Sequence, residues 1–173
     1  MATQTRRPTG EGPTEWTPSA GNNWECVSDE SDSTYVSATD TTATDVYTHA
    51  DFDFTGTVNK LTNFMRIKDT GTNCSFYNGR MIINGSYYYG AVRYGGASFA
   101  DETYDWLTNP DSSSAWTKDE LNGIGTHGVD TYSARAAIGA DRTGYISDFG
   151  WIVDYEEEAT GATQKSAIFG MNF

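Results

Sequence analysis

Turn signals recur so often along this chain that only short elements fit between them. Five of these signals are short runs that contain glycine: Thr70-Gly71, Asn78-Gly79, Asn84-Gly85, Gly95-Gly96 and Arg142-Thr143-Gly144. An Asn-Gly pair between apolar segments favours a two-residue hairpin turn, because both residues tolerate a positive φ. We therefore expect many short antiparallel strands, a pattern that is typical of a β-sandwich or barrel.

The segments between the turns are rich in aromatic and β-branched side chains, which favour a pleated, half-buried surface. Aromatic residues make up 14% of the 173 residues and leucine is scarce, so we expect a core built from large rings. Trp116 and Trp151 are expected to belong to that core. The expected strands span residues 24–27, 34–37, 46–54, 57–68, 74–77, 81–83, 87–94, 104–108, 132–138 and 145–155.

One short helix is predicted after Trp116. Thr117 and Glu120 have the spacing of a capping box, and Gly123 follows closely enough to end the helix within two turns. The expected fold is all-β: a jelly-roll sandwich of short antiparallel strands with one short helix. We expect the sandwich to span residues 24–158, between an extended N-terminal arm of residues 1–23 and a C-terminal tail of residues 159–173.

The N-terminal segment is expected to lie outside the sandwich, because it holds three of the four prolines and shows no apolar periodicity. Trp16 lies on this segment, where we expect it to act as an anchor in a pocket of another surface, most simply a neighbouring subunit. The alternative is that Trp16 folds back onto its own sandwich. Besides Trp16, four residues are expected to contact partners. Arg6 and Arg7 lie in the arm, and Phe169 and Phe173 lie at the C-terminal end.

The chain carries a net charge of −13, and such a surface repels phosphate backbones and anionic lipid. We therefore expect no nucleic-acid or membrane partner; a basic partner or bound cations would suit the charge. The first residues lack the apolar centre of a signal peptide, so we expect synthesis in the cytoplasm without a secretory address.

The two cysteines, Cys26 and Cys74, are expected to be buried free thiols, with a disulfide between them as the alternative. Two cysteines and two histidines do not give the spacing of a zinc site. We therefore expect no metal site built from these residues and no cofactor.

We expect no catalytic residues and hence no enzyme. The sequence has no G-x-S-x-G motif, and residues 154–158 do not fit the E-x-D-x-x-E spacing of jelly-roll glucanases. Asp29, Glu30 and Asp32 share one loop, where calcium binding stays open because carboxylates alone do not define such a site.

A row of tyrosines is the remaining candidate for chemistry. Tyr87, Tyr89 and Tyr94 form a candidate platform for stacking against sugar rings. Alternation along a strand sends Tyr88 to the opposite side from its two neighbours.

A set of segments spread over residues 13–155 has a familiar order. These segments are PTEWTPSAGNNWECVSDE, DSTYVS, TDVYTHADF, FTGTV, MRIK, TYDWLTNPDSSSAWTKDELN and ISDFGWIVDY. In this order the chain resembles small virion proteins of tailed bacteriophages that have a jelly-roll, lectin-like sandwich.

The resemblance implies a structural protein of the virion. Its first implication is a capsid decoration (cement) protein on the outer surface of the capsid, made in the host cytoplasm. Such a protein binds the major capsid protein and other copies of itself, as a homotrimer, and stabilises the shell. The alternative is a tail or fibre accessory protein whose sandwich binds host carbohydrate. No catalytic residue is attached to this family.

Overall fold

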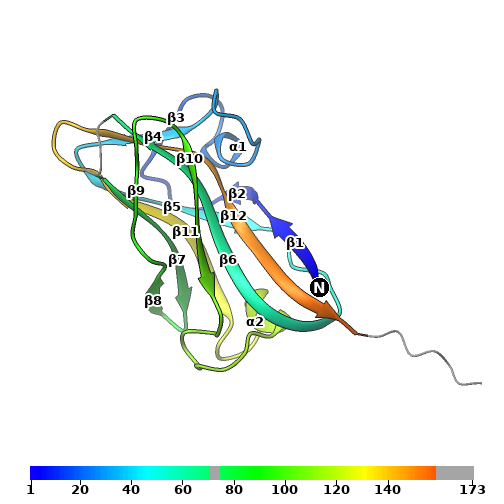
Figure 1. The fold of residues 1–173 in the computed structure, drawn as a ribbon. Helices are drawn as coiled ribbons and strands as arrows, with labels where there is room; N and C mark the ends of the chain where they lie inside the picture. The colour runs from blue at the N-terminus through cyan, green and yellow to red at the C-terminus, as the bar shows by residue number, and fades with distance from the viewer. Residues whose placement is uncertain (71–74, 159–173) are drawn as a thin grey trace, which may run out of the picture.

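The computed structural model describes residues 1–70 and 75–158, which form two antiparallel sheets packed face to face (Figure 1). The first sheet has the order β10 (Ala100–Trp106), β6 (Gly56–Asp69), β12 (Thr143–Glu157), β4 (Val36–Thr39) and β3 (Thr17–Pro18), with β1 (Ala2–Arg6) also on β12. The second has the order β2 (Pro8–Glu11), β5 (Thr42–His49), β11 (Val129–Ala137), β7 (Phe76–Ile83) and β8 (Ser86–Tyr89), with β9 (Arg93–Tyr94) also on β7. The predicted all-β sandwich is confirmed.

Aromatic rings fill the space between the sheets, as expected from the shortage of leucine. Tyr132 of the second sheet meets Trp151 of the first with ring centroids 4.8 Å apart, and Tyr47 meets Phe149 at 5.3 Å. Trp116 is buried as well, and its indole N–H donates to the carbonyl of Trp106. The prediction that Trp116 and Trp151 belong to the core is confirmed.

A β-bulge explains why β12 alternates only in part. The pairing of β12 with β6 shifts register between Ile146 and Asp148. The extra residue changes which positions point inward, so Ile146 is followed in the core by Phe149 and Trp151.

Only one of the two Asn-Gly pairs forms a turn. Asn84 and Gly85 have φ of 49° and 73° and form the predicted hairpin turn between β7 and β8. Asn78 and Gly79 instead lie inside β7, so the predicted turn there is wrong. A Cβ on Gly79 would lie 2.4 Å from Cγ of Asn63 on the opposite sheet, and glycine is needed for this close approach.

The first residues do not form an arm outside the sandwich, and this prediction is wrong. β1 pairs with β12 from Ala2 to Arg6, β2 pairs with the edge of β5, and β3 pairs with β4. In Figure 1 the blue N-terminal strand lies along β12. Pro8 and Pro18 fit because they occupy edge strands, where a missing backbone donor is tolerated, and Pro13 lies between β2 and β3.

Trp16 belongs to the protein's own core, which corrects the expectation that it inserts into another subunit. Its side chain is 4% exposed and lies 6.4 Å from the ring of Tyr77. The segment is fixed by Asp45, whose carboxylate accepts hydrogen bonds from the backbone N–H groups of Glu15 and Trp16 at 2.7 and 3.0 Å. The Asn23 amide and the Tyr47 hydroxyl donate to its other oxygen.

Both helices are single turns with an acidic capping residue. α2 (Lys118–Leu121) has the predicted capping box: Thr117 Oγ1 accepts from the Glu120 N–H, and the Glu120 carboxylate accepts from the Thr117 N–H. α1 (Asn23–Cys26) replaces the strand expected at residues 24–27. Within the described ranges, no helix has the length and apolarity needed to cross a membrane.

Cys26 ends α1 as a buried free thiol, and its Sγ donates to the carbonyl of Ala20. Cys74 lies outside the described residues.

We predict that Trp16→Ala lowers the free energy of unfolding by about 3–5 kcal/mol, because it removes a buried ring from the core. Trp24→Ala is the matched control, since Trp24 is only partly buried on α1 and should cost less than half as much. Urea denaturation of both variants measures this. Equal losses would contradict the assignment of Trp16 to the core.

We predict that Asp45→Ala destabilises the fold by about 3 kcal/mol or more, because four buried donors lose their acceptor. Hydrogen exchange should increase at the amides of Glu15 and Trp16 before it increases in the centre of β11. A variant with unchanged protection at these amides would show that Asp45 does not fix the segment.

Candidate functional site

The tyrosines predicted as a sugar platform lie together on the outer side of the second sheet. Tyr87 and Tyr89 on β8 pair with Ile82 and Arg80 of β7, and Tyr94 on β9 pairs with Phe76 at the other end of β7. Directly paired residues of an antiparallel sheet point to the same face. The three rings therefore share one face along the edge formed by β8 and β9. Figure 1 shows these two strands beside β7.

These rings are exposed to a degree unusual for large side chains. Tyr87, Tyr89 and Tyr94 are 57%, 45% and 58% exposed. The rings of Tyr87 and Tyr89 are within 24° of parallel, with centroids 6.4 Å apart. As predicted, Tyr88 points the other way, and its hydroxyl donates to Asp111 at 2.6 Å. That bond ties β8 to the loop after β10 and so helps to hold the exposed rings in place.

Two arginines and a phenylalanine complete this surface. Arg80 lies 5.0 Å from the centroid of the Tyr87 ring, and its Nε donates to Ser133 Oγ at 2.9 Å. Arg135 lies 5.6 Å from the Tyr89 ring and 5.7 Å from the Phe76 ring. We call this set the tyrosine face, and it consists of Phe76, Arg80, Tyr87, Tyr89, Tyr94 and Arg135.

The sequence contained a signal for the three members that were not predicted. Phe76 and Arg80 alternate along β7, and Arg135 lies on the outward register of β11. The turn predicted at Asn78-Gly79 hides the alternation across residues 76–83, which form one strand. Asn78 is in fact buried at the floor of the face opposite Arg135, and its Oδ1 has no hydrogen-bond partner among the described residues.

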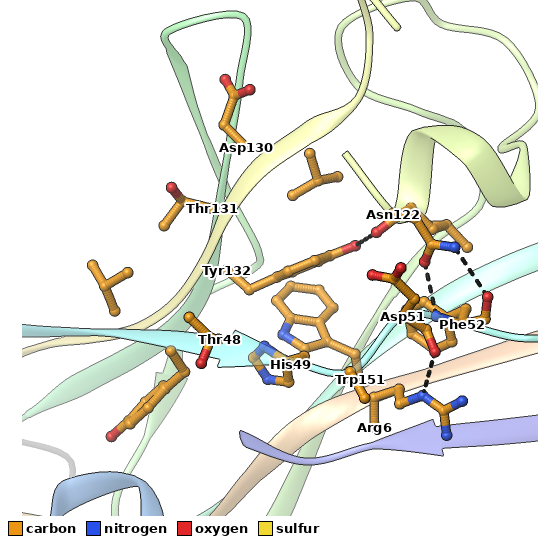
Figure 2. Close-up of a pocket in the computed structure, with 15 residues that line it drawn as sticks. Arg6, Thr48, His49, Asp51, Phe52, Asn122, Asp130, Thr131, Tyr132 and Trp151 are labelled. Carbon is orange, nitrogen blue, oxygen red and sulfur yellow. Dashed lines mark hydrogen bonds between the residues drawn. The ribbon is translucent and has the colours of Figure 1, made fainter. Parts of the chain in front are cut away.

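A cavity of about 350 Å³ lies elsewhere, between the ends of β5 and β11 and next to α2. Figure 2 shows the rings of His49, Tyr132 and Trp151 gathered in its wall. Several of its polar groups bind one another: Arg6 Nε donates to the carbonyl of Asp51, and the Asn122 side chain exchanges two bonds with the backbone of Phe52.

Three ring nitrogens on this cavity are unsatisfied. Both nitrogens of His49 and Nε1 of Trp151 are buried and make no hydrogen bond in the described part of the chain. Burial lowers the pKa of His49 to about 4, because the charged form loses hydration there. The cavity can hold small polar molecules such as water, and His49 is neutral at pH 7.

The residues expected to contact partners are placed in internal contacts where the structure describes them. Arg7 forms a bidentate pair with Asp148 at 2.9 and 3.0 Å and a second ion pair with Glu30. Asp148 and Glu30 together raise the pKa of Arg7. Arg6 binds the carbonyl of Asp51, as above. Phe169 and Phe173 lie outside the described residues.

The acidic loop considered for calcium is bound by arginines. Asp32 accepts from Nε and Nη2 of Arg66 at 2.7 and 2.8 Å and from Ser147, and these contacts hold its pKa below the usual range. Glu30 pairs with Arg7. Residues 1–70 and 75–158 contain no group of three or more His, Cys, Asp or Glu side chains arranged to hold a metal ion.

No protein-family model matches the chain, and no curated protein matches its sequence. Solved structures with some likeness include the CBM36-1 domain of a multidomain xylanase from the hindgut metagenome of Trinervitermes trinervoides, at 10% identity and a TM-score of 0.41, covering 91% of this chain and 100% of that one. Another is the family 11 carbohydrate-binding module of the cellulosomal cellulase Lic26A-Cel5E of Clostridium thermocellum, at 12% identity and a TM-score of 0.44, covering 92% and 90%.

A further likeness is to the enzymatically active domain of tailspike protein 4 of bacteriophage CBA120. The identity is 16% and the TM-score 0.34, covering 87% of this chain and 18% of that one. The assignment of a two-sheet sandwich rests on the strand pairings described above and not on these matches.

We predict that His49 makes the protein less stable in mild acid. Its pKa of about 4 in the folded state lies below the ordinary value of 6.5, so the unfolded chain binds more protons between these limits. The free energy of unfolding is therefore unaffected by His49 above about pH 6.5, and it falls as the pH drops towards 4 and the unfolded chain takes up the proton. Between pH 7 and pH 5 the loss is about 2 kcal/mol.

Denaturation of the parent and of His49→Gln at both pH values measures this loss. The variant keeps every carboxylate but lacks the titrating ring, so its stability should change less between the two conditions. Parallel curves for the two proteins would show that His49 is already charged or hydrated in the folded state.

Proposed function

We propose that this protein is a carbohydrate-binding β-sandwich and that the tyrosine face is its sugar-binding surface. The observation that carries the proposal is the exposure of Tyr87, Tyr89 and Tyr94, each about half open to solvent on a single face. A sandwich gains little stability from three large rings that are about half exposed to solvent, so a binding role explains them better than a structural one.

The chemistry of the face suits a sugar. A pyranose has a polar rim and an apolar face of C–H groups, and it needs a flat ring to lie on and hydrogen-bond donors beside it. Tyrosine offers a rigid, amphipathic surface that loses little conformational entropy on binding. The nearly parallel pair of Tyr87 and Tyr89 supplies the surface, and the guanidinium of Arg80 supplies donors at its edge.

The rings are also held in advance of binding. β8 is tied to β7 by the tight turn at Asn84-Gly85 and to the loop after β10 by the Tyr88–Asp111 bond. A pre-ordered surface binds more tightly because fewer side chains must be immobilised.

A role in a virion stays a prediction drawn from the sequence resemblance. The arm that would have reached the major capsid protein or another copy is used inside the protein's own sheets, so the proposal of a capsid decoration trimer loses that support. A tail or fibre protein that binds host carbohydrate agrees with the sugar-binding surface proposed here.

We predict that Tyr87→Ala, Tyr89→Ala and Tyr94→Ala each weaken glycan binding roughly tenfold, because each removes a ring from the contact surface. Glycan array screening with the parent protein identifies a ligand, and calorimetry with that ligand gives the affinities. The free energy of unfolding should change by about 1 kcal/mol or less, since the rings are largely exposed.

Ile124→Ala is the matched control, because Ile124 is a large apolar side chain that is 57% exposed just after α2 and is not part of the tyrosine face. It should bind like the parent. The proposal is overturned if no glycan binds the parent, or if the tyrosine variants bind as tightly as the control.

A further inference from the structure

The outer face of the second sheet differs in charge from the rest of the molecule. The strand register gives the side chains that point outward from β5, β7, β8, β9 and β11. They are Thr42, Thr44, Val46, Thr48, Phe76, Asn78, Arg80, Ile82, Tyr87, Tyr89, Tyr94, Thr131, Ser133, Arg135 and Ala137. This set contains two arginines and no carboxylate, although the chain has 24 Asp and Glu and a net charge of −13.

The acidic residues nearest to this set in the strand register lie at its rim and make other contacts. Glu15 accepts from the backbone N–H of Thr44 at the edge of β5. Asp130 occupies the bulge at the start of β11 and lines the cavity shown in Figure 2. Neither forms an ion pair with an arginine of the tyrosine face.

Several arginines outside this face form ion pairs with carboxylates. Arg7 pairs with Asp148 and Glu30, and Arg66 pairs with Asp32 and Asp101. By contrast, Arg80 and Arg135 form no ion pair with any described carboxylate. Arg80 uses Nε for Ser133, which leaves its terminal nitrogens available, and in the described part of the chain Arg135 lies against the rings of Phe76 and Tyr89.

The two arginines are close neighbours on the sheet. Arg80 pairs directly with Ser133, and Arg135 is two residues further along β11, so they are diagonal cross-strand neighbours. Such neighbours have Cα atoms about 7–8 Å apart, a span comparable to one or two sugar rings. Each guanidinium also lies against a tyrosine of the platform, Tyr87 for Arg80 and Tyr89 for Arg135.

We propose that the tyrosine face selects acidic sugars, with a ring carboxylate of the uronic-acid type bound by Arg80 and Arg135 while the sugar ring lies on Tyr87 and Tyr89. Arginine binds carboxylate in a planar, bidentate geometry, and such charge-assisted bonds are about twice as strong as neutral ones. The inference rests on the proposed function, because it names the class of sugar for the same surface.

The overall charge makes this selectivity local. A protein of charge −13 repels a polyanion at long range, so nonspecific attraction is not available to bind an acidic glycan. Binding of such a ligand therefore depends on the pair of arginines, and this makes their removal a sharp test.

The test uses two probes with one skeleton, a galacturonic acid trisaccharide and its fully methyl-esterified form, together with the pair of sialyllactose and lactose. We expect the parent to bind at least one acidic probe roughly tenfold or more above its neutral counterpart. Arg80→Gln and Arg135→Gln should each remove most of this preference and leave weaker, tyrosine-dependent binding.

Arg142→Gln is the control, because it makes the same change of charge in the turn between β11 and β12 and Arg142 is not part of the tyrosine face. It should keep the preference. If a neutral glycan from the array binds through the tyrosines while no acidic probe is preferred, the selectivity is overturned and the proposed function survives.

Other results overturn both. Acidic binding that persists in the arginine and tyrosine variants would place the ligand elsewhere on the protein. A thymidine oligonucleotide bound in place of every saccharide would identify the face as a surface for single-stranded nucleic acid, for which rings and arginines are also suited.

Discussion

A buried carboxylate sets the path of the first quarter of this chain. Asp45 is fully buried on β5, and it accepts bonds from the backbone of Glu15 and Trp16 and from the side chains of Asn23 and Tyr47. Burial raises the pKa of Asp45, whereas these donors favour its charged form and offset part of that rise. Because an unpaired carboxylate is costly inside a protein, the N-terminal segment must fold back over it. β2 and β3 then cover the exposed edges of β5 and β4.

This arrangement leaves the two lateral edges of the second sheet with different characters. One edge is closed by β2, which is held by the same segment that Asp45 fixes. The other edge is made of β8 and β9, two short strands that each cover part of β7. Short, twisted edge strands resist pairing with another chain. The tyrosine face therefore lies on an edge whose backbone is a poor template for aggregation but whose side chains are open to a ligand.

The sequence predicted those features that depend on local chemistry. The hairpin at Asn84-Gly85, the capping box at Thr117 and the opposite orientations of Tyr87 and Tyr88 follow from turn geometry, capping and the two-residue period of a strand. It did not predict features that depend on residues distant in the chain. Trp16 has no local apolar pattern, and its burial depends on residues distant in the chain, such as Tyr77 and Asp45. The Asn78-Gly79 pair is typical of a turn, and the reason for its glycine, the close approach of Asn63 from the opposite sheet, does not appear in the local sequence.

The net charge of a chain determines the electrostatic potential far from the protein, but it does not determine the charge of each individual surface. A net charge of −13 predicts no nucleic-acid or membrane partner, because such a charge repels polyanions at long range. Near the surface, a guanidinium interacts with the groups within a few ångströms. In the described structure the arginines that pair with acidic residues are Arg7, Arg66 and Arg93, and none of them belongs to the tyrosine face. No described carboxylate neutralises Arg80 or Arg135, because the alternating register of β5, β7 and β11 presents threonine, serine and aromatic side chains beside them. Their charge is therefore available to a ligand. The selectivity of the tyrosine face thus follows from which residues each strand turns outward, a property of register that composition does not contain.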